Sequence, residues 1–251
     1  MRARRLATLI TVLVTAGTLA LTGSALGPVA SSDASPGRYL WRADLDAAST
    51  AIPTPARPSV DTTTKSLLRA GASNTKATAV AAAASDCVGC TGRAGTLQVL
   101  YFDGSGAVSA DNVANAVSQC PDCPADAVAG TVSIAVSVQV VLARRADQLV
   151  VNNRAFSVNV ACNGCTARAE AYQFVLAGGS RRDLSAPSKD KIGQLQDQLA
   201  AQLQATAGQA APQARISADQ ATSSFADQLE QILVKDTGST VVQRNVDVQV
   251  G

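Results

Sequence analysis

The 251-residue chain contains no histidine, and this absence removes several kinds of chemistry at once. Histidine is the usual general base, the usual zinc ligand and the middle member of most nucleophilic triads. Serine and cysteine hydrolases that rely on a histidine base are therefore excluded, as are HExxH metalloproteases. Enzymes that work with carboxylates or with cysteine alone remain open.

An excess of charge of one sign is also missing. The 21 Lys and Arg residues nearly balance the 19 Asp and Glu residues, which leaves a formal net charge of +2. The basic residues are scattered along the chain, whereas binding to nucleic acid requires a concentrated basic surface. We therefore expect no nucleic-acid partner.

Only the N-terminus carries a long apolar run. Residues 1–30 begin with basic residues, continue with an uncharged stretch from Leu6 to Leu21, and end in small residues through Ala25 and Ala30. This order is typical of a secretory signal peptide, and the stretch is short for a membrane span, which needs about 20 residues. We expect cleavage after Ala25 or Ala30, with an uncleaved signal anchor as the alternative. The mature chain is then expected to be secreted or associated with the cell wall, without a stable membrane span.

Residues with large apolar side chains are scarce from 31 to 74, where Ala, Ser, Thr and Pro predominate. Three prolines, Pro53, Pro55 and Pro58, oppose a packed helix or strand there, so we predict a disordered arm over 31–74. The arm contains the only tryptophan, Trp41. It indicates either a docking segment or a chance aromatic residue in a weakly ordered arm.

Cysteine, by contrast, is arranged in a pattern, because the six cysteines form three C-x-x-C pairs. The pairs are Cys87 with Cys90, Cys120 with Cys123, and Cys162 with Cys165. The first and third segments, "CVGCTGRAGTLQ" and "CNGCTARAEAYQ", share seven of their twelve residues, including Gln98 and Gln173 at equal distances from the pair. The middle segment places Gln139 in the same way if about eight residues are inserted at its turn. We interpret the three segments as internal repeats.

The middle segment indicates the secondary structure of all three. Residues 131–142 alternate β-branched and small polar side chains, which is typical of a strand, and equivalent segments are expected to share one state. A type I′ turn at Asn163-Gly164 makes the third segment an antiparallel hairpin with its two cysteines face to face. This hairpin has one apolar face, which includes Phe156, and one polar face, which includes Arg168 and Glu170.

The pattern changes after residue 179. Two stretches have apolar residues at helical spacing, which predicts two amphipathic helices packed on the sheet or on each other (Ile192, Leu195, Leu199 and Leu203; Phe225, Leu229, Ile232 and Leu233). The chain ends on "TVVQRNVDVQV", another alternating strand. We therefore predict an α+β fold: antiparallel β-hairpins tipped by C-x-x-C pairs over 75–179, and a helical region with a final strand over 180–251.

Three kinds of chemistry compete for the cysteine pairs. In an exported protein an even number of cysteines usually forms disulfides, and residues that flank a two-residue hairpin turn lie close enough for a local bridge. Thiol–disulfide exchange normally needs a C-x-x-C at a helix N-terminus, whereas a strand follows each pair here. Zinc held by two pairs would leave the third pair over, and an oxidising compartment opposes free thiolates. We favour local bridges within each pair, with no metal and no cofactor.

The segments "NVANAVSQC", "VSVQVVLA" and "NRAFSVNVACNGCTARAEAYQFVLAGG", followed by a Gln-rich helix pair, also resemble a known family. They are similar to the cysteine-repeat extracellular domain of actinobacterial membrane proteins of the peptide zinc metalloprotease type, over roughly residues 75–235. No protease residue carries over, because the chain has no HExxH and no multi-span region. The resemblance extends to the cysteine pairs alone, without a catalytic role, and the insertion after Cys123 departs from it.

These observations together predict a secreted, noncatalytic structural or interaction module at the cell envelope, stabilised by local disulfides and bound to an envelope or protein partner. The alternative hypothesis, from a different class, is an extracytoplasmic thiol–disulfide oxidoreductase that uses the C-x-x-C pairs.

Overall fold

The computed structural model describes residues 42–70, 74–104, 106–120, 130–160, 164–179, 184–205 and 211–251. The expected signal peptide, both cleavage positions and Trp41 lie outside these residues. The elements, in chain order, are β1 (Arg42–Ala51), β2 (Ser59–Ala70), β3 (Asn74–Ser85), β4 (Thr91–Asp103), β5 (Ala107–Gln119), β6 (Val132–Arg145), β7 (Gln148–Val160), β8 (Thr166–Gly178), α1 (Ala186–Ala205), α2 (Ala211–Thr237) and β9 (Ser239–Val250).

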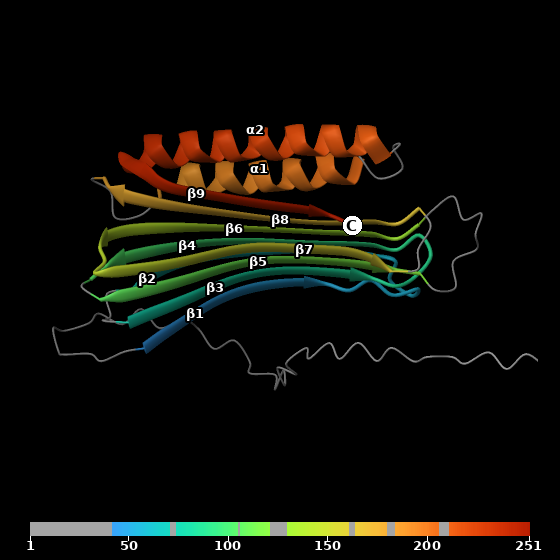
Figure 1. Ribbon diagram of the computed structural model, residues 1–251, viewed down its shortest axis with the longest axis horizontal. Coiled ribbons are helices and arrows are strands. Elements are labelled where there is room, and N and C mark those ends of the chain that lie inside the picture. Colours follow the sequence, from blue (N-terminus) through green and yellow to red (C-terminus); the bar gives the residue numbers. More distant parts are fainter. Residues whose placement is uncertain are drawn as a thin grey trace, which may run out of the picture. The chain divides into compact units, whose positions relative to one another are not determined.

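Successive strands of the chain alternate between two sheets. The four-stranded sheet has the order β1-β3-β5-β7, and the five-stranded sheet has the order β2-β4-β6-β8-β9. All neighbours pair in parallel except β8 and β9, which are antiparallel. The chain therefore winds as a solenoid with two strands in each coil, and each coil pairs with the coils before and after it (Figure 1).

This arrangement shows that the predicted α+β fold of antiparallel hairpins is wrong, because the described chain is mostly β-strand and its two sheets are parallel except for the β8–β9 pair. The strands on either side of Cys87 and Cys90 are β3 and β4, which belong to different sheets and face each other through their side chains. Strands β6 and β8, and β4 from Thr96 to Phe102, are buried on both faces over most of their length, as strands of a covered parallel sheet are, whereas a half-buried hairpin has one polar face. A short turn between two strands with alternating side chains occurs both in a hairpin and in a solenoid, so this sequence pattern does not distinguish the two.

The strand state predicted for the three cysteine segments is confirmed, but the boundary of the arm is wrong. Residues 42–51 and 59–70, which were assigned to a disordered arm, form β1 and β2. They pair in register with β3 and β4, so a neighbouring coil stabilises a segment whose own composition gives little indication of a strand. The three prolines lie between the two strands, where they do not interrupt pairing.

Small side chains fill much of the space between the sheets. At the end that holds the cysteines this interior is mostly alanine, and toward the other end it includes Leu100, Phe102, Val141 and Val175. The Ser133 hydroxyl donates to the Val117 carbonyl across the interior at 2.7 Å. Because so short a side chain reaches the opposite backbone, the two sheets must lie close together at this point.

Glutamine amides form a ladder through the middle of this interior. Gln98, Gln139 and Gln173 lie in register on β4, β6 and β8 and are fully buried. Gln139 Nε2 donates to Gln98 Oε1 at 2.7 Å, and Gln173 Nε2 donates to Gln139 Oε1 at 2.7 Å. Asn245 of β9 continues the ladder by donating to Gln173 Oε1 at 3.3 Å. The glutamines found at equivalent positions in the sequence are thus joined directly in the structure.

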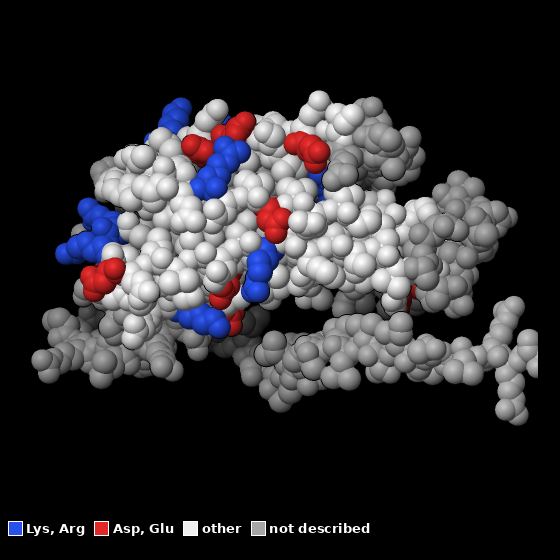
Figure 2. Space-filling view, viewed as in Figure 1, with Lys and Arg blue, Asp and Glu red and all other residues white. Residues whose placement is uncertain are grey.

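The two expected helices are present and lie along the strands (Figure 1). Their apolar faces pack on the outer face of the five-stranded sheet, and all but one of the residues predicted for these faces are buried (Ile192, Leu195, Leu199, Leu203, Phe225, Leu229 and Leu233 are buried; Ile232 is partly buried). They meet Leu97, Val138 and Phe174, among other residues of β4, β6 and β8. On the face seen in Figure 2, Lys, Arg, Asp and Glu are scattered over a largely uncharged surface.

Replacement of Gln139 by leucine tests the glutamine ladder. Leucine is of similar size but removes the donor to Gln98 and the acceptor for Gln173, so we expect Gln139→Leu to lower the free energy of unfolding by about 1–3 kcal/mol. Urea denaturation provides the measurement. Gln119→Leu, at an exposed position of β5, is the matched control and should change stability by less than about 0.5 kcal/mol. Equal effects at both positions would show that the ladder does not contribute to stability.

Candidate functional site

Cysteines were the only site residues predicted from the sequence. The four that lie in the described ranges, Cys87, Cys90, Cys120 and Cys165, are found where a strand of one sheet ends or a strand of the other begins. Cys87 and Cys90 form a disulfide with their Cα atoms 5.3 Å apart, so this local pair is confirmed. It lies in the turn that leads from β3 in one sheet to β4 in the other, which we call an arc, and not at the tip of a hairpin. Cys90 is buried and Cys87 is half-buried.

The other two pairs are described only in part. Cys120 and Cys165 are each disulfide-bonded, while Cys123 and Cys162 lie outside the described residues, so the local pairing Cys120–Cys123 and Cys162–Cys165 stays a prediction. In the middle coil Thr131 takes the position before the strand that Cys90 and Cys165 take in their coils. Its backbone N–H lies 3.2 Å from Cys165 Sγ. This placement agrees with an insertion of about eight residues after Cys123.

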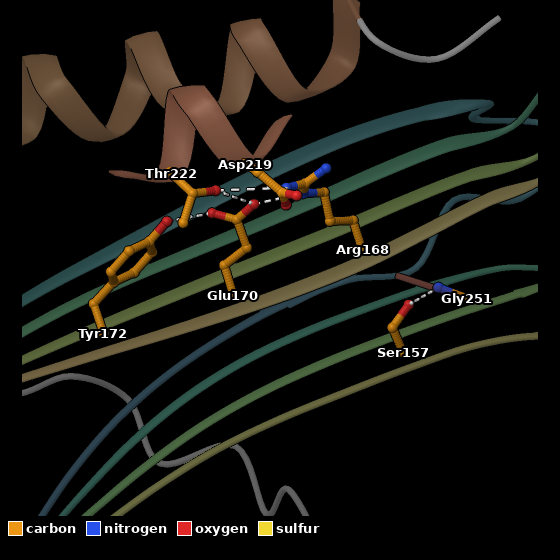
Figure 3. Close-up of polar contacts among 7 residues, drawn as sticks. All are labelled: Ser157, Arg168, Glu170, Tyr172, Asp219, Thr222 and Gly251. Atoms are coloured by element: carbon orange, nitrogen blue, oxygen red, sulfur yellow. Dashed lines mark hydrogen bonds and ion pairs between the residues drawn. The ribbon is translucent and has the colours of Figure 1, made fainter. Parts of the chain in front are cut away.

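A buried cluster of charged and polar side chains in the described chain was not predicted from the sequence. It lies between β8 and α2, where Arg168, Glu170 and Tyr172 alternate on the outer face of β8 and Thr222 approaches from α2 (Figure 3). Arg168 is 3 % exposed, and Glu170 and Tyr172 are fully buried. A buried charge is costly unless it is both paired and hydrogen-bonded, so each contact in this cluster matters.

Both oxygens of the Glu170 carboxylate have donors. Arg168 Nε and Thr222 Oγ1 donate to Oε1, at 2.5 and 3.0 Å, and the Tyr172 hydroxyl donates to Oε2 at 2.5 Å. Asp219 approaches the Arg168 guanidinium at 3.9 Å from the exposed side of α2. The cluster therefore pairs one buried cation, Arg168, with one buried anion, Glu170, and a second anion, Asp219, lies near Arg168 at the surface.

The environment of Tyr172 opposes ionisation of its hydroxyl. Burial raises the pKa of Tyr172 well above its ordinary value, and the nearby Glu170 carboxylate raises it further. The ring packs edge-on against Phe225 of α2, with the ring centroids 4.9 Å apart. The hydroxyl thus stays protonated and remains a donor to Glu170 throughout the physiological range. This arrangement suits a structural contact between helix and sheet more than proton transfer.

The sequence-based assignment of faces around the third cysteine pair is wrong. It placed Arg168 and Glu170 on a solvent face and Phe156 on the apolar one. The structure buries both charged residues beneath α2 and leaves Phe156 56 % exposed on the outer face of β7. One signal could have revealed this: in "TARAEAYQFVL" the charged residues share a face with Tyr172 and Phe174, so that face was never purely polar.

Within the described ranges, no group of three or more His, Cys, Asp or Glu side chains is placed to hold a metal ion. Neither α1 nor α2 is both long enough and apolar enough to cross a membrane. Comparisons with protein-family models, with curated proteins and with solved structures find no match.

Removal of the Glu170 charge tests whether the buried cluster attaches α2 to the sheet. Glu170→Gln leaves the Arg168 guanidinium buried without its anion, so we expect a loss of about 3–5 kcal/mol in the free energy of unfolding, measured by urea denaturation. The control is Asp227→Asn, which breaks an exposed pair with Arg244 and should cost at most about 1 kcal/mol. Equal losses would contradict the role given to burial.

The raised pKa of Tyr172 predicts an alkaline limit to stability. An unfolded tyrosine ionises near pH 10, so its contribution is complete below about pH 10 and is lost as the pH rises toward the higher pKa of the folded state. Free energies of unfolding measured between about pH 8 and pH 11 should fall more steeply for the native chain than for Tyr172→Phe. The variant should be less stable at neutral pH, because Glu170 loses a donor. Parallel curves would refute the assignment.

Proposed function

We propose that this chain is a secreted, noncatalytic structural or interaction module of the cell envelope, stabilised by disulfides within its C-x-x-C pairs. The observation that carries the proposal is the hydrogen bonding of the polar side chains between the two sheets. They are engaged in joining one coil to the next and one sheet to the other, as in the Gln98–Gln139–Gln173 ladder. A resemblance to the cysteine-repeat extracellular domain described above agrees with this role and remains a hypothesis.

Hydrogen bonds between the two sheets support a structural role. Thr96 Oγ1 donates to the Val80 carbonyl at 2.6 Å, and Ser118 Oγ donates to the Thr166 carbonyl at 2.9 Å. Each bond joins one sheet to the backbone of the other. Opening one coil would therefore break contacts in its neighbours, and such coupling is typical of solenoid proteins. Disulfides at the arcs add a covalent restraint that persists in an oxidising compartment.

The environment of the described disulfide gives little support to the oxidoreductase hypothesis. Strand β4 begins directly after Cys90, so the pair does not lie at a helix N-terminus, where reactive C-x-x-C pairs are normally found. Cys90 is 1 % exposed, which limits attack by a substrate thiol. The two functions make opposite predictions about trapped intermediates.

A mixed-disulfide trap distinguishes the two functions. Cys90→Ser leaves Cys87 able to attack substrates, and an oxidoreductase would accumulate mixed disulfides with envelope proteins on non-reducing gels. We expect none. The double variant Cys87→Ser with Cys90→Ser should still be exported and folded, with an unfolding free energy lower by about 2 kcal/mol because the closed loop is short. Specific adducts of the single variant, together with catalysed reduction of insulin by the native chain, would establish the alternative.

Cell fractionation tests the location. The proposal expects the chain in the medium or the cell wall, with a mass that corresponds to a start near Leu26 or Ser31. A cytoplasmic chain that retains Met1 would contradict export.

A further inference from the structure

A pocket of about 300 Å³ lies between α1 and the outer face of the five-stranded sheet, above β2 and β4. This volume is at the lower end of the range of small-molecule sites. Its floor is apolar and its rim is polar and exposed; the lining residues are Asp61, Thr63, Arg93, Ala94, Gly95, Ile134, Val136, Gln196, Asp197 and Ala200.

Two side chains that line this pocket have a buried polar atom with no hydrogen-bond partner in the part of the chain that the structure describes. These atoms are Arg93 Nε, a donor, and Gln196 Oε1, an acceptor. Gln196 is 5 % exposed, and its Nε2 donates to the Thr96 carbonyl at 3.2 Å, which fixes the orientation of the amide. Arg93 is oriented by Asp61, whose carboxylate lies 3.2 Å from Nη2. Unpaired buried polar atoms are rare in folded proteins, and each calls for an explanation.

Counted from the first cysteine pair, strands β3–β4, β5–β6 and β7–β8 form the first, second and third coils. The third coil shows what the positions of Arg93 and its neighbours hold when they are filled. Arg93 and Arg168 lie in the same row of the five-stranded sheet, with Ile134 between them, and Gly95 and Glu170 occupy the row two residues further on. In the third coil the Glu170 carboxylate accepts a hydrogen bond from Arg168 Nε. In the first coil glycine replaces that glutamate, so the arginine is kept while the acceptor is absent and its space is left open.

We propose that this pocket is a binding site for a small ligand that carries an amide group, such as an amino-acid amide or a peptide unit. The ligand carbonyl accepts from Arg93 Nε in the place that the Glu170 carboxylate takes in the third coil. The ligand N–H donates to Gln196 Oε1, and a short aliphatic group lies against Ile134 and Val136. An amide supplies an acceptor and a donor together, as this pair of groups requires.

Charge at the rim selects an amide over a carboxylate. Asp61 already neutralises Arg93, and Asp197 adds a second negative charge at the opening. The net negative charge of the rim would therefore repel a free carboxylate, whereas it would not repel a neutral amide. The inference does not depend on the envelope role, because a passive module and an oxidoreductase could both contain this site.

Titration of the full chain with N-acetylalaninamide, followed by NMR chemical shifts of the backbone amides, tests the proposal. We expect saturable shifts at residues that line the pocket, and no saturable shifts with acetate. Gly95→Glu recreates the residue of the third coil and should abolish binding. A Cβ at this position meets only ordinary contacts, 3.6 Å to Thr63 Oγ1 at the nearest, so Gly95→Ala is the matched control and should still bind.

A third variant keeps the test informative if Gly95→Glu fails to fold. Gln196→Leu removes the acceptor alone and should weaken binding roughly fivefold to tenfold, the usual worth of one neutral hydrogen bond. No saturable shifts from the folded native chain would overturn the proposal. An affinity unchanged by Gln196→Leu, or saturable shifts that persist in a folded Gly95→Glu chain, would also overturn it, because the probe would then be bound elsewhere.

Discussion

The short distance between the two sheets is the constraint on which the rest of the structure depends. Serine and threonine hydroxyls reach the backbone of the opposite sheet, so positions between the sheets near the cysteines admit only small side chains. Gly92 illustrates this limit, since a Cβ there would lie 3.0 Å from Pro53 Cδ and 3.2 Å from the Ala51 carbonyl oxygen. Alanine buries little apolar area per residue, so such an interior gains less from the hydrophobic effect than a core of larger residues does. Side-chain hydrogen bonds and the apolar helix layer on the outer face provide the remaining cohesion.

Hydrogen-bond ladders suit an interior of this kind. An amide carries a donor and an acceptor at the end of one side chain, so identical residues in register satisfy each other along a row. Gln98, Gln139 and Gln173 do this on three neighbouring strands. The row also penalises slippage, because a shift of one residue would place each amide on the outer, helix-covered face. The same residues that add stability therefore also specify the alignment of the coils.

Arg93 and Arg168 lie in one row across the five-stranded sheet, and their different surroundings show how the contacts on its outer face depend on the residues and the helix that cover it. Beneath α2, Arg168 donates to Glu170 through Nε and to Thr222 through Nη2, and this pairing offsets the cost of burying the charge. Beneath α1, Arg93 pairs with Asp61 at the surface, its Nε has no partner among the described residues, and the neighbouring glycine leaves a pocket. A difference of one residue, glutamate or glycine, thus separates a closed structural contact from an open site.

Local pattern alone was enough to predict the strands of the cysteine segments, the two C-terminal helices, the final strand and the equivalence of the three glutamines. Each follows from the period of its apolar residues or from spacing along the chain, and these are properties of short segments. The Cys87–Cys90 bridge followed in the same way. Strands β1 and β2 were missed because they depend on β3 and β4, which lie about one coil away in the sequence.

Only the tertiary structure decided between a hairpin and an arc, and therefore which faces are buried. In both geometries the chain reverses direction between two strands whose side chains alternate. The difference lies in whether these two strands pair with each other or with strands of other coils. That choice depends on total burial: β4, β6 and β8 are covered by the facing sheet on one side and by helices on the other, which a solenoid provides and a hairpin does not. The polar cluster around Glu170 and the pocket beside Arg93 depend on the same choice, because both form where a helix from the end of the chain covers a strand.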